Sequence, residues 1–125
     1  MVIFYSTGSG KPGERLLRII QAVVPGEDTK ICRDTDVLAN ALRQPRNSEV
    51  IAILHAASRS ELPDILFLRE LLWNVKLILV LPDNNKDTVA KGHSLGPRFL
   101  SYHNGNFWDI AAVLKRMIEN MDINH

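Results

Sequence analysis

Short runs of apolar residues alternate along the chain with segments in which apolar positions recur every three or four residues. The runs cover residues 2–5, 29–32, 50–54, 76–81 and 98–102. Each run has the pattern of a β-strand, and each following segment has the periodicity of an amphipathic helix. Regular alternation of strands and helices predicts an α/β domain with a mainly parallel sheet.

Helices are predicted after each strand. The segments with helical spacing are 12–24, 35–43, 62–73, 86–95 and 107–121, and we expect Asp34 or Thr35 to cap the second of them. Asn106, with Asp109 three residues later, resembles the capping box of the last helix. Residues 50–54 are almost continuously aliphatic, which is typical of a central strand covered by helices on both faces.

The order of the strands follows from the handedness of their connections. Each strand–helix–strand crossover is right-handed, so few compact arrangements of five such units exist. The commonest at this size is the flavodoxin-like three-layer sandwich, a five-stranded parallel sheet of order 2-1-3-4-5 with five helices. The 125 residues, of which 46% are hydrophobic and 23% charged, suit a single domain over residues 1–125.

Charge and cysteine content narrow the class of protein. Lys and Arg total 15 against 14 Asp and Glu, and residues 1–46 carry 7 basic and 5 acidic side chains, so we expect neither nucleic-acid nor membrane-surface binding. We expect neither a signal peptide nor a membrane span, because the apolar runs are short and no basic residue precedes the first of them. Cys32 has no cysteine to pair with in the chain, which fits a cytoplasmic location, and we interpret it as a small buried residue.

The predicted topology also predicts where a ligand site would lie. Open parallel sheets bind ligands beyond the carboxyl ends of the strands, where the strand order reverses, here between the first and third strands. Four loops reach this crevice, at 6–11, 55–60, 82–85 and 102–106. Their candidate residues, outside the first loop, are His55, Ser58, Asp83, Asn84, Tyr102, His103 and Asn104.

Several short motifs follow one another in the second half of the chain. They are Leu62-Pro63-Asp64 before a leucine-rich helix, the strand VKLILVL, Leu95-Gly96-Pro97, Phe99-Leu100 and Leu114-Lys115-Arg116-Met117. With this succession, the sequence from about residue 50 to residue 117 resembles the receiver domain of bacterial response regulators, of the chemotaxis-receiver type. The resemblance implies the flavodoxin-like fold and a role in two-component signal transduction.

The residues that carry receiver chemistry are absent from the matching positions. A working receiver needs acids after the first strand to bind Mg²⁺, an aspartate at the end of the third, Ser or Thr after the fourth and a lysine after the fifth. In this chain, the positions of the acids are occupied by Tyr5-Ser6 or Ser6-Thr7, and the position of the aspartate by His55 or Ala56. Leu81 or Pro82 occupies the position of the hydroxyl residue, and Tyr102 occupies that of the lysine.

We therefore expect a degenerate receiver, or pseudo-receiver, with no catalytic residues, no cofactor and no ordinary Mg²⁺-dependent aspartyl phosphorylation. Such a module acts by protein–protein interaction, with a protein partner or as a homodimer. The resemblance places the contact on the face formed by the fourth helix, the fifth strand and the fifth helix. Phe99, Phe107 and Trp108 are the candidate residues of this interaction face.

The loop after the first strand supports an alternative function. Ser6, Thr7, Gly8, Ser9, Gly10 and Lys11 supply hydroxyls and glycine amides before a helix N-terminus, a combination that binds anions. Tyr5 and Pro12 occupy positions where a Walker A loop requires glycine and Ser or Thr, so the loop is not of that type. It is similar to the FMN phosphate loop of flavodoxins, which implies a binder of FMN or another phosphorylated ligand. A plain glycine-rich turn is the simpler interpretation.

The histidines allow more than one interpretation. His55 could be a general base, a phosphoacceptor in place of the aspartate, or a partner of His103, although a histidine bonded to backbone at a strand end is the simpler structure. The four histidines lack metal-ligand spacing, so we expect no metal site. A hydrolase using Ser6 or Ser9 with His55 or His103 would lack the nucleophile-elbow motif.

Overall fold

The computed structural model describes residues 1–7, 11–24, 28–45 and 49–123. Its sheet contains β1 (Val2–Tyr5), β2 (Thr29–Cys32), β3 (Ile51–His55), β4 (Lys76–Leu81) and β5 (Phe99–Tyr102). All neighbouring strands pair in parallel, in the order β2-β1-β3-β4-β5. The predicted flavodoxin-like topology is therefore confirmed.

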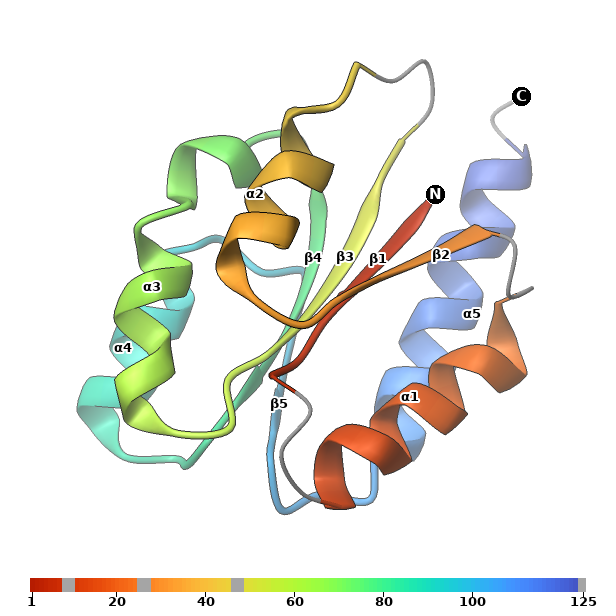
Figure 1. The fold of residues 1–125 in the computed structure, drawn as a ribbon. Helices are drawn as coiled ribbons and strands as arrows, with labels where there is room; N and C mark the ends of the chain where they lie inside the picture. The colour runs from red at the N-terminus through yellow and green to blue at the C-terminus, as the bar shows by residue number, and fades with distance from the viewer. Residues whose placement is uncertain (8–10, 25–27, 46–48, 124–125) are drawn as a thin grey trace.

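Helices cover both faces of this sheet. They are α1 (Lys11–Val23), α2 (Thr35–Arg43), α3 (Leu62–Leu66), α4 (Lys86–His93) and α5 (Trp108–Ile123), with short 3₁₀ turns η2 (Arg59–Glu61) and η3 (Arg69–Leu72) on either side of α3. Figure 1 shows α1 and α5 on one face of the sheet and α2, α3 and α4 on the other. The molecule thus has the three layers that the alternating sequence predicts.

The alternation of side chains along each strand divides the core in two. Ile3 and Tyr5 belong to the cluster beneath α2 and α3, whereas Val2 and Phe4 belong to the cluster that includes α1 and α5. Every residue of β3 is buried, which confirms its predicted central position. Cys32 is 0% exposed, and burial raises the pKa of its thiol, as expected for an unreactive core cysteine.

Two helix starts follow the predicted capping residues. Asp34 Oδ1 accepts a hydrogen bond of 2.8 Å from the Val37 N–H at the start of α2. Asn106 Oδ1 accepts one of 3.1 Å from the Trp108 N–H at the start of α5. These side chains satisfy amide groups that have no partner inside their helices.

The predicted continuous helix over residues 62–73 is wrong. The α-helix ends at Leu66, and the chain continues as a 3₁₀ turn in which the Leu71 N–H donates to the Leu68 carbonyl. Leu62 and Ile65 in the α-helix, and Leu68 and Leu72 in the segment that follows it, are all buried, so the apolar face continues across the break. Phe67 lies at the junction, where its side chain is 89% exposed.

No helix among the described residues is long and apolar enough to cross a membrane.

Candidate functional site

Three polar side chains meet at the carboxyl ends of the strands. Ser6 follows β1, His55 is the last residue of β3, and His103 follows β5. We call them the Ser6–His55–His103 cluster. Because side chains alternate along a strand, Ser6 shares the sheet face of Val2 and Phe4, which is the face covered by α1 and α5. The cluster lies at the carboxyl ends of β1, β3 and β5, where the topology predicts a ligand crevice.

Hydrogen bonds join the three side chains into a chain. Ser6 Oγ lies 3.0 Å from His55 Nδ1, and His55 Nε2 lies 2.9 Å from His103 Nδ1. The two imidazole rings are nearly parallel, at 11°, with centroids 5.1 Å apart. A neutral imidazole donates at one nitrogen and accepts at the other, so the direction of one bond fixes the direction of the next.

His55 is a neutral group in this cluster. Its side chain is 0% exposed, and its pKa is lowered from 6.5 to about 4. Burial is the main cause of this shift, the neighbouring His103 adds to it, and Glu61 acts in the opposite direction. At neutral pH, His55 therefore links Ser6 to His103 without carrying a charge.

Gly13 makes room for the cluster. A Cβ atom at this position of α1 would lie 2.8 Å from Ser6 Oγ and 3.8 Å from His55 Nδ1. The first turn of α1 can thus cover the Ser6–His55 hydrogen bond only because residue 13 has no side chain. Neither Gly13 nor Glu61 is among the predicted site residues, since no local motif marks either of them.

The exposure of the cluster is uneven, and this limits its chemistry. Ser6 is 1% exposed and His55 is fully buried, whereas His103 is half-buried. Ser6, His55 and His103 are residues of the hydrolase hypothesis. However, the Ser6 hydroxyl lies at the buried end of the hydrogen-bonded cluster, where a substrate carbonyl cannot approach. The geometry instead ties together the ends of β1, β3 and β5.

The other predicted crevice residues lie apart from the cluster. Ser58 Oγ is 2.8 Å from Ser60 Oγ and 3.4 Å from Glu61 Oε2, all within one loop. Asp83 accepts a 2.7 Å bond from Arg59, and this bond holds the pKa of the Asp83 carboxyl below its usual range. The Arg59–Asp83 ion pair joins the segments that follow β3 and β4.

Three further candidates form no side-chain hydrogen bond to His55 or His103 in the part of the chain that the structure describes. Asn84 and Asn104 are exposed. Tyr102 is half-buried and packs against the core cluster on the α2 side of the sheet. Of the seven predicted crevice residues, the structure brings together His55 and His103.

Part of the predicted anion loop is described. Thr7 is exposed, and Lys11 begins α1 with an exposed side chain. Gly8, Ser9 and Gly10 lie outside the described residues. Binding of phosphate or FMN at this loop stays a prediction. In the part of the chain that the structure describes, no group of three or more His, Cys, Asp or Glu side chains could hold a metal ion.

The predicted interaction face requires one correction. Trp108 is 69% exposed and Phe99 is half-buried, but Phe107 is only 1% exposed. Phe107 packs among the core residues beneath α1 and α5, with the Arg15 guanidinium 5.0 Å from its ring centroid. It adopts φ +67°, so that the chain turns into α5 and sends the two adjacent aromatic side chains in different directions.

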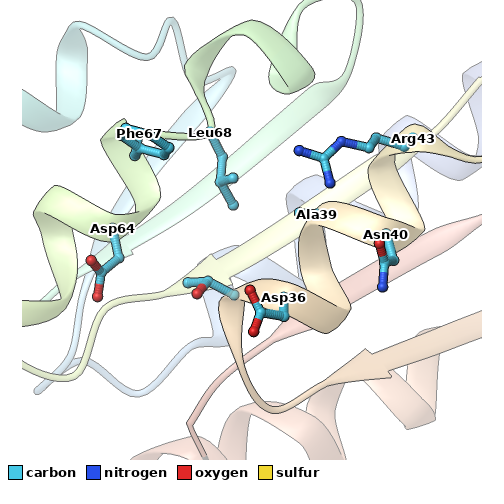
Figure 2. Close-up of a pocket in the computed structure, with 8 residues that line it drawn as sticks. Asp36, Ala39, Asn40, Arg43, Asp64, Phe67 and Leu68 are labelled. Atoms are coloured by element: carbon cyan, nitrogen blue, oxygen red, sulfur yellow. The ribbon is translucent and has the colours of Figure 1, made fainter.

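A groove that the sequence does not predict lies between α2 and α3 (Figure 2). Its volume is about 360 Å³, and its lining residues are Thr35, Asp36, Ala39, Asn40, Arg43, Asp64, Phe67 and Leu68. We call it the α2–α3 groove. It lies on the face of the sheet opposite to α1 and α5, away from the Ser6–His55–His103 cluster (Figure 1).

A comparison of the chain with protein-family models, curated proteins and solved structures found no match.

Proposed function

We propose that this protein is a receiver-like signalling module that acts by binding another protein and is not switched by phosphorylation of an aspartate. The observation that supports this most directly is the state of His55. It stands at the end of β3, where the receiver resemblance puts the phosphoacceptor. Both of its ring nitrogens are hydrogen-bonded and its side chain is fully buried, so neither nitrogen can attack a phosphoryl donor.

The residues after β1 support the same proposal. Receivers bind Mg²⁺ there through carboxylates, because hard cations prefer oxygen ligands that carry charge. This chain has Tyr5, Ser6 and Thr7 at those positions. Burial, with a smaller effect of nearby carboxylates, raises the pKa of Tyr5 to about 12, so its phenol stays neutral. None of these side chains is a substitute for an acidic pair.

Exposed aromatic side chains support a role in protein contact. Phe67 is 89% exposed, Trp73 78% and Trp108 69%. Large aromatics of this kind commonly anchor protein interfaces. Trp108 belongs to the face that the receiver resemblance nominates, whereas Phe99 on β5 is half-buried and packs against the core cluster on the α1 and α5 side of the sheet.

The phosphorylation half of the proposal is tested by intact-mass spectrometry. The protein is incubated with acetyl phosphate and Mg²⁺, beside an ordinary receiver domain as a positive control. We expect the control to gain a phosphoryl group and this protein to keep its mass. A hydroxylamine-sensitive phosphate on any aspartate would overturn the proposal. A flavin band in the visible spectrum, released on denaturation, would favour the FMN alternative.

The interaction half is tested by affinity capture with two matched tryptophan variants. Trp108→Ala removes an exposed side chain from the proposed face, and Trp73→Ala removes one of similar exposure from the end of η3. We expect a cellular partner to be retained by the wild type and by Trp73→Ala, and to be lost with Trp108→Ala. Equal retention by all three proteins would show that the α5 face is not the contact.

A further inference from the structure

We propose that the α2–α3 groove is an interface between two copies of this chain. This inference goes beyond the proposed function, because it concerns another surface and does not depend on whether the protein can be phosphorylated. It rests on the distribution of charge along the groove and on the exposed aromatic at its edge.

The exposed face of α2 carries a charge at each end. Asp36, Ala39, Asn40 and Arg43 recur at positions i, i+3, i+4 and i+7, so they lie on one face of the helix. Asp36 and Arg43 are separated by two helical turns, about 10 Å along the axis. One end of the groove is thus acidic and the other basic. Figure 2 shows the Arg43 side chain reaching from α2 toward α3.

These charges have no partner within the described part of the chain. The ion pairs found there join Arg59 to Asp83, Lys76 to Glu49 and Lys91 to Asp87. Arg43, Asp36 and Asp64 are exposed, and none of them forms a pair or a side-chain hydrogen bond among the residues that the structure describes. The groove therefore holds charges of both signs that are available to an outside partner.

A second copy of the chain supplies a partner of opposite charge to Asp36 and to Arg43. Under a two-fold axis across the groove, the two α2 helices run antiparallel. Arg43 of one copy then faces Asp36 of the other, and the reverse pair forms at the same time. A two-fold contact requires this kind of self-complementary surface. A partner of a single charge sign would leave one end of the groove unpaired.

The centre of the groove is apolar, as a dimer contact requires. Ala39 and Leu68 are buried, at 7% and 8% exposure, while Phe67 beside them is 89% exposed. The same symmetry brings Phe67 of one copy to the 360 Å³ hollow of the other. One aromatic side chain buries about 150–250 Å², whereas a standard interface buries about 800 Å² per partner. We therefore expect a weak dimer that forms with increasing protein concentration.

Sedimentation velocity over a range of concentrations tests the dimer. We expect a monomer–dimer equilibrium in the wild type, and at least a tenfold weaker association in Phe67→Ser. Trp73→Ser is the matched control, since it removes an exposed aromatic that does not line the groove, and it should associate as the wild type does. A wild type that stays monomeric throughout, or equal dimerisation of Phe67→Ser, would overturn the proposal.

Charge reversal tests the two-fold geometry itself. Asp36→Arg places two arginines opposite each other, and Arg43→Asp places two aspartates opposite each other, so each variant alone should associate more weakly. An equimolar mixture of the two should form a heterodimer, and the double variant Asp36→Arg/Arg43→Asp should recover self-association. Circular dichroism verifies that each variant is folded. Failure of the mixture and of the double variant to recover association would contradict the antiparallel pairing of α2.

Discussion

The Ser6–His55–His103 cluster and the α2–α3 groove both place polar side chains beside apolar ones, but they satisfy them differently. In the cluster, Ser6 and both nitrogens of His55 are bonded inside the protein, away from solvent. In the groove, Asp36 and Arg43 are exposed and form no ion pair among the described residues. Buried polar groups without partners destabilise a fold, whereas exposed ones remain available for recognition. The cluster should therefore govern folding stability, and the groove should govern association.

The largest expected difference between the two regions is in the response to acid. The pKa of His55 is about 4 in the folded protein, whereas a histidine without these interactions, as in the unfolded chain, has a pKa of 6.5. Below pH 6.5 the unfolded chain binds a proton that the folded chain does not, so stability falls as the pH falls toward 4. Between about pH 7.5 and about pH 5 this amounts to roughly 2 kcal/mol. Urea unfolding at several pH values measures the loss.

The variant His55→Gln isolates this contribution, because glutamine can form hydrogen bonds without titrating. We expect its free energy of unfolding to fall by roughly 2 kcal/mol less than that of the wild type over the same pH range. His93→Gln, at an exposed position of α4, should keep the wild-type dependence. Parallel pH curves for wild type and His55→Gln would show that His55 is not a buried neutral imidazole.

The second difference concerns the space around the cluster. In Gly13→Ala, the new Cβ forces Ser6 Oγ away from His55 Nδ1. Leaving a buried nitrogen without its partner costs about 1–3 kcal/mol, which exceeds the gain of up to about 1 kcal/mol from replacing glycine in a helix. We expect a net loss of about 1 kcal/mol in the free energy of unfolding.

A double-mutant cycle checks the cause of that loss. In a Ser6→Ala background the clashing oxygen is gone, so Gly13→Ala should be neutral or slightly stabilising. The same destabilisation in both backgrounds would place the clash elsewhere.

Local patterns in the sequence predict the fold well because each element of this sheet carries its own signal. The bounds of β2 and β4 match the predicted runs, and Asp34 caps α2 as expected. The segment 62–73 differs because its spacing of apolar residues fits both an α-helix and a 3₁₀ turn. Packing against the sheet, which no local pattern encodes, selects the second.

The candidate site is harder to predict because its contacts join distant residues. Strand periodicity and topology together place Ser6, His55 and His103 on one face at one edge, so the cluster could have been inferred from the predicted sheet. The role of Gly13 depends on how closely α1 approaches the sheet. The α2–α3 groove is lined in part by Phe67 and Leu68, which lie between α3 and η3. A continuous helix over residues 62–73 does not predict this break.

The smallest expected effect is the change in the free energy of unfolding on substitution of Phe67, which we compare with substitution of its buried neighbour Leu68. Phe67 is 89% exposed and its neighbour Leu68 is 8% exposed. At a concentration where the protein is monomeric, Phe67→Ser should change the free energy of unfolding by less than about 0.5 kcal/mol, as surface substitutions usually do. Leu68→Ala leaves a cavity in the core and should be clearly destabilising. Urea unfolding of both variants measures the contrast. If Phe67→Ser destabilised the monomer as much as Leu68→Ala, Phe67 would be a packing residue. Weaker dimerisation of Phe67→Ser would then no longer identify the interface.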